Sequence, residues 1–145
     1  MIRVIIADDH AIVRRGVHRI LEKHPNICVV GEASNGADAV RLVLQLRPDV
    51  LLLDLEMPDL HGIQVARQLR AKKVPVSIVI LSANDDEHLI QEILQAGVDG
   101  YLSKSDSPSK IRSVIAGLSK QHLPAITSLV IAFGIIAFPF DIFFS

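Results

Sequence analysis

Residues 48–58 read Pro-Asp-Val-Leu-Leu-Leu-Asp-Leu-Glu-Met-Pro, the clearest strand pattern in the chain. Its core, Val50 to Leu53, is a continuous apolar run with no alternation between apolar and polar side chains. A strand of this kind is buried on both faces, as in a parallel sheet that is covered by helices. Because the run ends at Asp54, a carboxylate is predicted at the carboxyl end of a buried strand.

Short apolar runs elsewhere predict further strands of the same sheet, at residues 4–7, 27–30, 76–81 and 101–102. Between the runs, apolar residues recur about every 3.6 positions, which is typical of amphipathic helices. These helical stripes cover residues 13–21, 39–44, 65–69, 89–94 and 111–118. The alternation predicts consecutive β–α units, and therefore an α/β fold with a parallel sheet and right-handed crossovers.

Proline and glycine positions agree with this division of the chain. A helical stripe is followed by a proline and then by a strand at Pro25, Pro48 and Pro75, where a helix cannot continue. Gly97 stands where a left-handed helix terminus is expected. The dipeptide Ser107-Pro108 predicts a helix cap followed by the first residue of the last helix.

Composition narrows the class of protein. The chain has 145 residues, the usual size of one domain, and its 50% hydrophobic and 21% charged residues exclude a disordered protein. A net charge of −1 without a basic run gives no reason to expect nucleic-acid binding. The single cysteine, Cys28, is interpreted as a buried residue outside any disulfide. With no signal peptide before the first strand, we expect a cytoplasmic protein.

Polar residues follow the predicted strands at the edge where such sheets bind ligands. Asp8 and Asp9 follow the first strand, Asp54 the third, Ser82 the fourth and Lys104 the fifth. The strand order 2-1-3-4-5 is adopted from known flavodoxin-like folds and makes the first and third strands neighbours. The three carboxylates are then expected to converge on one spot.

Three converging carboxylates repel one another unless a cation neutralises them, and oxygen ligands with open positions suit Mg²⁺. An aspartate there can act as a nucleophile, while Lys104 and the Ser82 hydroxyl stabilise a transferring phosphoryl group. Taken singly, each of these residues is usual in a turn, a cap or a solvated surface; together they favour phosphoryl chemistry. The six histidines are scattered and predict no metal site, and His10 is interpreted as a loop residue.

Four motifs resemble the receiver domains of two-component response regulators over about residues 2–120. They are Asp8-Asp9-His10, Asp54-Leu55-Glu56-Met57-Pro58 with Gly62, Ser82-Ala83, and Gly100-Tyr101-Leu102-Ser103-Lys104. The Asp-Asp-His start, and a serine rather than a proline after Lys104, are most similar to the NarL/FixJ (LuxR-type) subgroup. The resemblance implies a doubly wound, flavodoxin-like (βα)5 sheet.

The resemblance implies a role for each matching residue of the acidic cluster. Asp54 is the expected phosphoacceptor, with a histidine kinase, a phosphotransfer protein or a small phosphodonor as the source of the phosphoryl group. Asp8, Asp9, Asp54 and the backbone carbonyl of Glu56 are the expected Mg²⁺ ligands. The alternatives are an aspartate-nucleophile phosphatase, which usually carries Asp-x-Asp after its first strand, and a pseudo-receiver that binds partners without phosphorylation.

The same resemblance implies a switch. Ser82 and Lys104 are expected to contact the phosphoryl group, and Tyr101 to move inward as Ser82 is drawn towards it. The alternative for Tyr101 is an ordinary, partly buried aromatic residue. The face made by the fourth helix, the fifth strand and the fifth helix is expected to carry the signal through homodimerisation or partner binding.

The division expected from the sequence is a receiver domain over 1–120 and a hydrophobic C-terminal tail over 121–145. Residues 123–140 contain no charged residue, and no helix-turn-helix is recognisable, so DNA binding is not expected of this chain. Three interpretations of the tail stay open. The first is a membrane anchor over 123–144, which would be marginal in length and interrupted by Pro124 and Pro139. The second is a segment packed on the domain or on a second copy. The third is the remnant of a truncated or frame-altered gene.

Overall fold

Strands and helices alternate strictly in the computed structural model, which describes residues 1–83 and 87–120. Every predicted element is present, with its bounds moved by a few residues. The elements are β1 (Ile2–Ala7), α1 (Ala11–Glu22), β2 (Ile27–Ala33), α2 (Gly36–Leu46), β3 (Val50–Leu53), α3 (Gly62–Ala71), β4 (Ser77–Ser82), α4 (Glu87–Gln95), β5 (Gly100–Ser103) and α5 (Pro108–Lys120).

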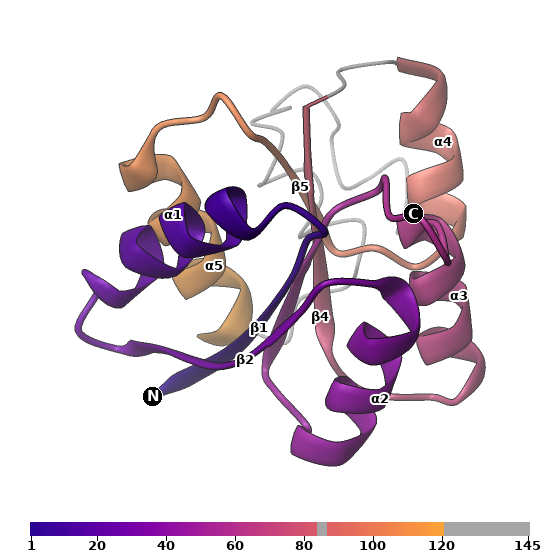
Figure 1. The fold of residues 1–145 in the computed structure, drawn as a ribbon, viewed down its shortest axis with the longest axis horizontal. Helices are drawn as coiled ribbons and strands as arrows, with labels where there is room; N and C mark the ends of the chain where they lie inside the picture. Colours follow the sequence, from indigo (N-terminus) through magenta and orange to yellow (C-terminus); the bar gives the residue numbers. More distant parts are fainter. Residues whose placement is uncertain (84–86, 121–145) are drawn as a thin grey trace, which may run out of the picture.

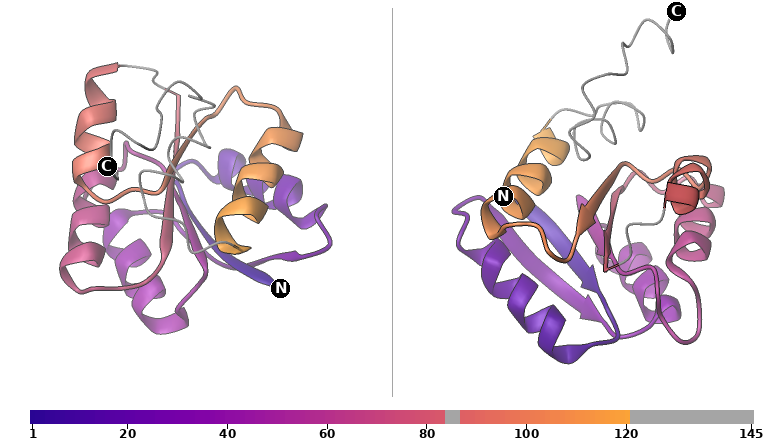
Figure 2. Two further views of the ribbon diagram at one scale, coloured as in Figure 1. Left: turned by 180° about the vertical axis from the view of Figure 1, so that it is seen from behind. Right: turned by 90° about the horizontal axis from the view of Figure 1, so that it is seen from above.

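The strands form one parallel sheet in the order β2-β1-β3-β4-β5, as expected. Helices α1 and α5 cover one face and α2, α3 and α4 cover the other (Figure 1, and from above in Figure 2). This doubly wound arrangement is the predicted flavodoxin-like fold. It makes β1 and β3 neighbours, so the strand order reverses between them.

The continuous apolar strands supply two cores at once. Along β3, Leu51 and Leu53 point into the core under α2, α3 and α4, whereas Val50 and Leu52 point into the core under α1 and α5. All four side chains are fully buried or nearly so. The strand is apolar at every position because both of its faces are covered.

Strand β2 differs because it is an edge strand. Most of its residues are only partly buried, and Cys28 is among them, so the interpretation of Cys28 as a buried residue is wrong. A continuous apolar run cannot distinguish an edge strand from a central one. The register between β1 and β2 also shifts by one residue. Val4 pairs with Val29, but the next residue, Ile5, pairs with Gly31. Val30 is therefore an extra residue in β2, a β-bulge.

Helix termini agree with the sequence signals. Gly97 has φ +81°, the left-handed conformation expected after a helix. The Ser107 hydroxyl accepts a hydrogen bond from the Lys110 backbone N–H at 3.1 Å, so Ser107 caps α5 as predicted. Arg70 donates to the Gly97 carbonyl at 2.8 Å and to Asp99 at 2.6 Å, which ties α3 to the loop before β5.

His18 of α1 lies between two glutamates. Its Nδ1 is 3.0 Å from Glu32 Oε2 on β2, and its Nε2 is 3.1 Å from Glu22 Oε1, one turn along the helix. The hydrogen bond with Glu32 is the main cause that raises the pKa of His18, Glu22 adds to it, and partial burial opposes both. Protonated His18 therefore ties α1 to the edge strand.

We expect the free energy of unfolding to fall as the pH rises from His18's ordinary pKa of 6.5 through its raised value. The sign follows because the folded state holds the proton more tightly than the unfolded chain. The change is below about 1 kcal/mol, since solvent screens this partly exposed pair. Thermal melts of wild type and His18→Gln across this pH range measure it; the same fall in both proteins would contradict the assignment.

The tail over 121–145 lies outside the described residues, so its three interpretations and the boundary after residue 120 stay predictions. In the part of the chain that is described, no helix combines the length and the apolar character needed to cross a bilayer.

Candidate functional site

The predicted carboxylates meet where β1 and β3 end side by side. Ala7 and Leu53 are register partners at the ends of the two strands, and the Asp54 N–H donates to the Ala7 carbonyl at 2.9 Å. This pairing brings Asp54 next to Asp8, and both are buried, with 4% and 2% of their surfaces exposed. Asp9 is exposed at the rim. The sheet geometry therefore produces the cluster that the sequence predicts.

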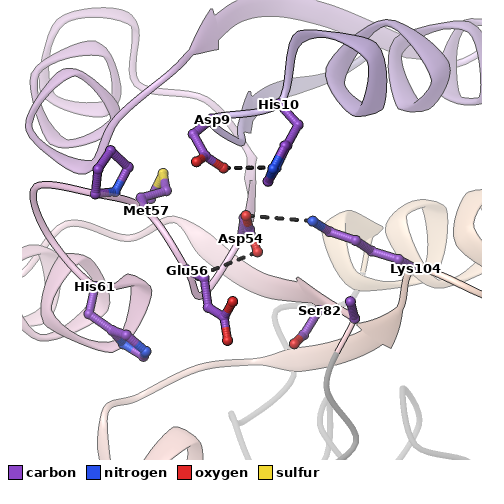
Figure 3. A pocket seen from close by; sticks show the side chains of 10 residues that line it. Asp9, His10, Asp54, Glu56, Met57, His61, Ser82 and Lys104 are labelled. Atoms are coloured by element: carbon purple, nitrogen blue, oxygen red, sulfur yellow. Dashed lines mark hydrogen bonds and ion pairs between the residues drawn. The ribbon is translucent and has the colours of Figure 1, made fainter.

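Lys104 neutralises part of this charge. Its Nζ lies 3.1 Å from Asp8 Oδ2 and 3.5 Å from Asp54 Oδ2. The Lys104 N–H donates to the Ser82 carbonyl at 2.9 Å, which continues the β4–β5 pairing and points the lysine into the cluster (Figure 3). Burial alone lowers the pKa of Lys104, but its contacts with Asp8 and Asp54 outweigh burial and raise the pKa.

Asp54 is a destabilised anion in this setting. Burial is the main cause that raises its pKa, and the nearby Asp8 charge adds to the effect. The Lys104 ammonium and the Glu56 backbone N–H, 3.4 Å from Asp54 Oδ1, pull the pKa down without cancelling the rise. One ammonium thus serves two buried carboxylates. The cluster has an excess of negative charge that a cation would relieve.

Asp9 and Asp54 face a cavity of about 660 Å³ at the carboxyl edge of the sheet. It is lined by Asp9, His10, Asp54, Glu56, Met57, Pro58, His61, Ser82, Ala83 and Lys104. Ser82, the last residue of β4, is buried on the wall. Tyr101 is not among the lining residues; it lies on β5, 8% exposed, in the core under α2, α3 and α4.

His10 lies in the turn between β1 and α1, and its ring approaches the carboxylates. Its side chain is 64% exposed, yet Nδ1 lies 2.9 Å from Asp9 Oδ1 and 3.2 Å from Asp8 Oδ1. Potential ligand atoms of Asp8, Asp9, His10 and Asp54 all lie within 4.8 Å of one another. The only sequence signal was adjacency to two aspartates, because the turn after β1, and not a helical spacing, brings the ring back over the carboxylates.

Two residues, Gly62 and Asp59, hold the loop that follows Asp54. Gly62 donates its N–H to the Leu55 carbonyl at 2.8 Å, and it sits so close that a Cβ would lie 2.7 Å from the Asp54 carbonyl oxygen. Asp59 accepts hydrogen bonds from Ala37 N at 3.0 Å and from Gly36 N at 2.8 Å, and these bonds lower the pKa of Asp59. The loop is thereby attached to α3 at one end and to α2 in its middle.

The family model for the response regulator receiver domain matches residues 4–116. The chain belongs to the response regulator receiver family. The match covers β1 through most of α5, and so includes every residue of the acidic cluster. Receiver domains of this family act in phosphorylation-dependent two-component signalling and bind Mg²⁺ in an acidic pocket.

Curated relatives of this receiver include transcription regulators of the same subgroup. It is 42% identical over 121 residues to the response regulator UvrY of Escherichia coli K12, which covers 81% of this chain and 56% of UvrY. It is 38% identical over 120 residues to the transcriptional regulatory protein LiaR of Bacillus subtilis, covering 83% of this chain and 57% of LiaR. The chain thus spans somewhat more than half the length of these relatives.

Solved receivers share the fold. The signal receiver domain of the response regulator NarL from Mycobacterium tuberculosis superposes with a TM-score of 0.80 at 37% identity, covering 83% of this chain and 97% of that one. The isolated receiver of RcsB from Salmonella enterica, in the presence of the phosphomimetic BeF₃⁻, superposes with a TM-score of 0.77 at 27% identity, covering 88% and 98%. The likeness to the NarL/LuxR-type subgroup is therefore confirmed.

Proposed function

We propose that this receiver is a phosphorylation-dependent switch that takes a phosphoryl group on Asp54. The observation that carries the proposal is the position of Asp54: a buried carboxylate at the end of β3 that lines the cavity, with Lys104 Nζ 3.5 Å away. The donor is the phosphohistidine of a histidine kinase or of a phosphotransfer protein. The structure of RcsB with a phosphomimetic supports the proposal by likeness.

The residues present fit a divalent cation. Asp8 Oδ2 is buried, and within residues 1–83 and 87–120 its close partner is Lys104 Nζ, at 3.1 Å in an ion pair that Lys104 shares with Asp54. Carboxylate oxygens are the ligands that Mg²⁺ prefers. Asp8, Asp9, Asp54 and the Glu56 backbone carbonyl would hold it. When bound, Mg²⁺ supplies positive charge that stabilises the transferring phosphoryl oxygens.

The chain's own groups carry out the transfer. An Asp54 carboxylate oxygen forms a bond to phosphorus while the bond from phosphorus to the donor's imidazole nitrogen breaks, and the electron pair leaves with the imidazole. Lys104 and the Ser82 hydroxyl donate to the phosphoryl oxygens. Met57 and Ala83 contribute apolar side chains to the cavity wall.

Ser82 and Tyr101 are the proposed switch. Ser82 Oγ moves towards the phosphoryl group, and Tyr101, already 8% exposed, turns further into the core space that Ser82 leaves. The face of α4, β5 and α5 then changes shape and alters homodimerisation or the binding of another protein. Phosphorylation in this account shifts a two-state equilibrium.

Intact-protein mass spectrometry after incubation with acetyl phosphate and Mg²⁺ tests the proposal. We expect a gain of one phosphoryl group, about 80 Da. No such gain is expected when a chelator is present during the incubation. No gain, with the fold confirmed by circular dichroism and with a cognate kinase also failing to label the protein, would point to a pseudo-receiver that acts by binding alone.

Replacing Asp9 by Asn should weaken Mg²⁺ binding by at least about tenfold, equal to about 1.4 kcal/mol, because a unit of negative charge is lost and an anionic ligand oxygen becomes a neutral amide oxygen. Isothermal calorimetry of Mg²⁺ binding measures the effect. The control is Asp38→Asn, a change at a partly exposed carboxylate in the first turn of α2, outside the acidic cluster. Equal affinities for wild type and Asp9→Asn would remove Asp9 from the ligand set.

A further inference from the structure

The peptide that joins Asp8 to Asp9 is held by a side chain from outside the acidic cluster. Arg14, on α1, reaches back to the turn after β1, and its Nη1 donates to the Asp8 carbonyl oxygen at 2.6 Å. A trans peptide is planar, so a fixed carbonyl also fixes the orientation of the whole peptide unit. The directions in which the Asp8 and Asp9 side chains leave the backbone depend on that orientation.

Arg14 is itself anchored on the edge strand. Its Nε donates to Glu32 Oε1 on β2 at 3.3 Å, and its side chain is 18% exposed. The planar guanidinium presents its donors in a rigid fork, so two bonds to different partners fix its orientation as well as its position. Arg14 therefore connects the turn after β1 to a strand that carries none of the cluster.

The other contacts of this turn hold different atoms. The Asp8 N–H donates to the Ala33 carbonyl at 3.0 Å, which continues the pairing of β1 with β2. The His10 N–H donates to Asp8 Oδ1 at 2.8 Å. These bonds fix the amide and the carboxylate of Asp8, but neither fixes the peptide between Asp8 and Asp9. That peptide is where the contact from Arg14 acts.

Charge and geometry predict opposite effects for Arg14. As a cation close to an acidic site, it would repel a second cation, so its removal would strengthen Mg²⁺ binding if charge alone mattered. As a support for two carboxylates, it would favour Mg²⁺, so its removal would weaken binding. The sign of the change therefore separates the two accounts.

We propose that Arg14 is a positioning residue which, anchored on Glu32, holds the Asp8–Asp9 peptide in the conformation that assembles the acidic cluster. Arg14 is not among the residues that line the cavity, so it acts through the turn and not by touching a substrate. The inference rests on the proposed function in taking Asp8 and Asp9 as Mg²⁺ ligands. It adds a residue that keeps them in place before the ion arrives.

The first measurement is calorimetry of Mg²⁺ binding to the full chain carrying Arg14→Ala. We expect the affinity to fall by at least about tenfold, the lower end of the loss when a group that orients a metal ligand is removed. A thermal melt checks that the variant is folded under the conditions of the titration.

The rate of labelling by acetyl phosphate supplies a second readout. Asp54 is placed by its own strand, through the bond from its N–H to the Ala7 carbonyl at 2.9 Å, and does not depend on Arg14. Arg14→Ala should therefore need about tenfold more Mg²⁺ to reach half of its maximal rate. The maximal rate at saturating Mg²⁺ should stay within about twofold of wild type. A general loss of structure would lower both.

The matched control is His18→Gln. His18 is on the same helix and contacts the same glutamate, with its Nδ1 3.0 Å from Glu32 Oε2. Its other nitrogen, Nε2, faces Glu22, further along the helix and away from the turn. The control thus loosens the contact between α1 and β2 without removing the bond to the Asp8 carbonyl. Its Mg²⁺ affinity should stay within about twofold of wild type.

Hydrogen exchange of the metal-free protein tests the turn directly. In Arg14→Ala the His10 amide should exchange about tenfold faster than in wild type, because the turn opens more often. In His18→Gln its exchange should not change. Equal Mg²⁺ affinity and equal exchange in wild type and Arg14→Ala would overturn the proposal.

Two further results would also overturn it. Tighter Mg²⁺ binding by Arg14→Ala would show that the guanidinium acts only by its charge. An equal loss of affinity in His18→Gln would show that the packing of α1 on β2, and not the bond to Asp8, supports the cluster. If wild type takes up no label, the proposed function fails, whereas exchange at His10 still decides the role of Arg14.

Discussion

An Asp54→Asn variant takes up no phosphoryl group from acetyl phosphate under conditions in which wild type gains about 80 Da. The amide is nearly the same size as the carboxylate but cannot act as the attacking oxygen. Asp8, buried beside it, does not replace it, because Asp8 is not among the residues that line the cavity. The loss of labelling should therefore be complete.

The control for this experiment is Asp59→Asn. Asp59 lies five positions further along the same loop, where it caps α2 through Gly36 and Ala37. Asparagine keeps one of the two acceptor oxygens that Asp59 presents to Gly36 and Ala37, so this variant should lose some stability but still fold and take up label. Stoichiometric labelling of Asp54→Asn would show that another carboxylate is the acceptor. Peptide mapping of the borohydride-reduced product would then identify that residue.

Replacing Gly62 by Ala is expected to destabilise the protein by about 2 to 3 kcal/mol, which lowers the melting temperature by roughly 10 °C or more. The added Cβ would lie 2.7 Å from the Asp54 carbonyl oxygen and 2.9 Å from Leu55 Cα. Both are backbone atoms of the segment that follows β3, so they cannot rotate away as a side chain could. The steric conflict should also displace Asp54 and weaken Mg²⁺ binding.

Gly117→Ala is the matched control, because Gly117 lies inside α5 and a Cβ there, apart from the helix's own backbone, meets no atom of the described residues within 4 Å. This substitution should stabilise the protein by about 0.5 to 1 kcal/mol, since alanine favours the helix. Chemical denaturation of both variants measures the two effects. Similar stabilities for Gly62→Ala and wild type would mean that the loop after β3 yields easily and does not position Asp54.

The α/β architecture could be predicted because periodicity reports burial. The continuous run from Val50 to Leu53 indicates a strand covered on both faces, and that is where β3 lies. The same reasoning failed for Cys28, since the position of a strand within a sheet depends on long-range pairing that a local pattern does not contain. The strand order itself was adopted from known folds, and the structure confirms it.

The convergence of Asp8, Asp9 and Asp54 with Lys104 could be predicted for a related reason. Carboxyl ends of parallel strands share one edge, so residues that directly follow strands meet there. The contacts that depend on loop conformation could not be anticipated in this way. The position of His10 over the carboxylates is set by the turn after β1, and no periodicity describes it. The roles assigned to these residues stay predictions until the variants are measured.

The register shift at Val30 affects whether the outer edge of β2 can pair with a strand of another molecule. Backbone groups on the free edge of a sheet can recruit an extended segment of another molecule, and a long, flat edge is a template for aggregation. The extra residue bends β2 near its middle, and the exposed Glu32 adds a charge beyond the bend. The opposite edge, β5, spans only Gly100–Ser103. Neither edge offers a long, straight template, so we expect this sheet to resist strand-to-strand polymerisation.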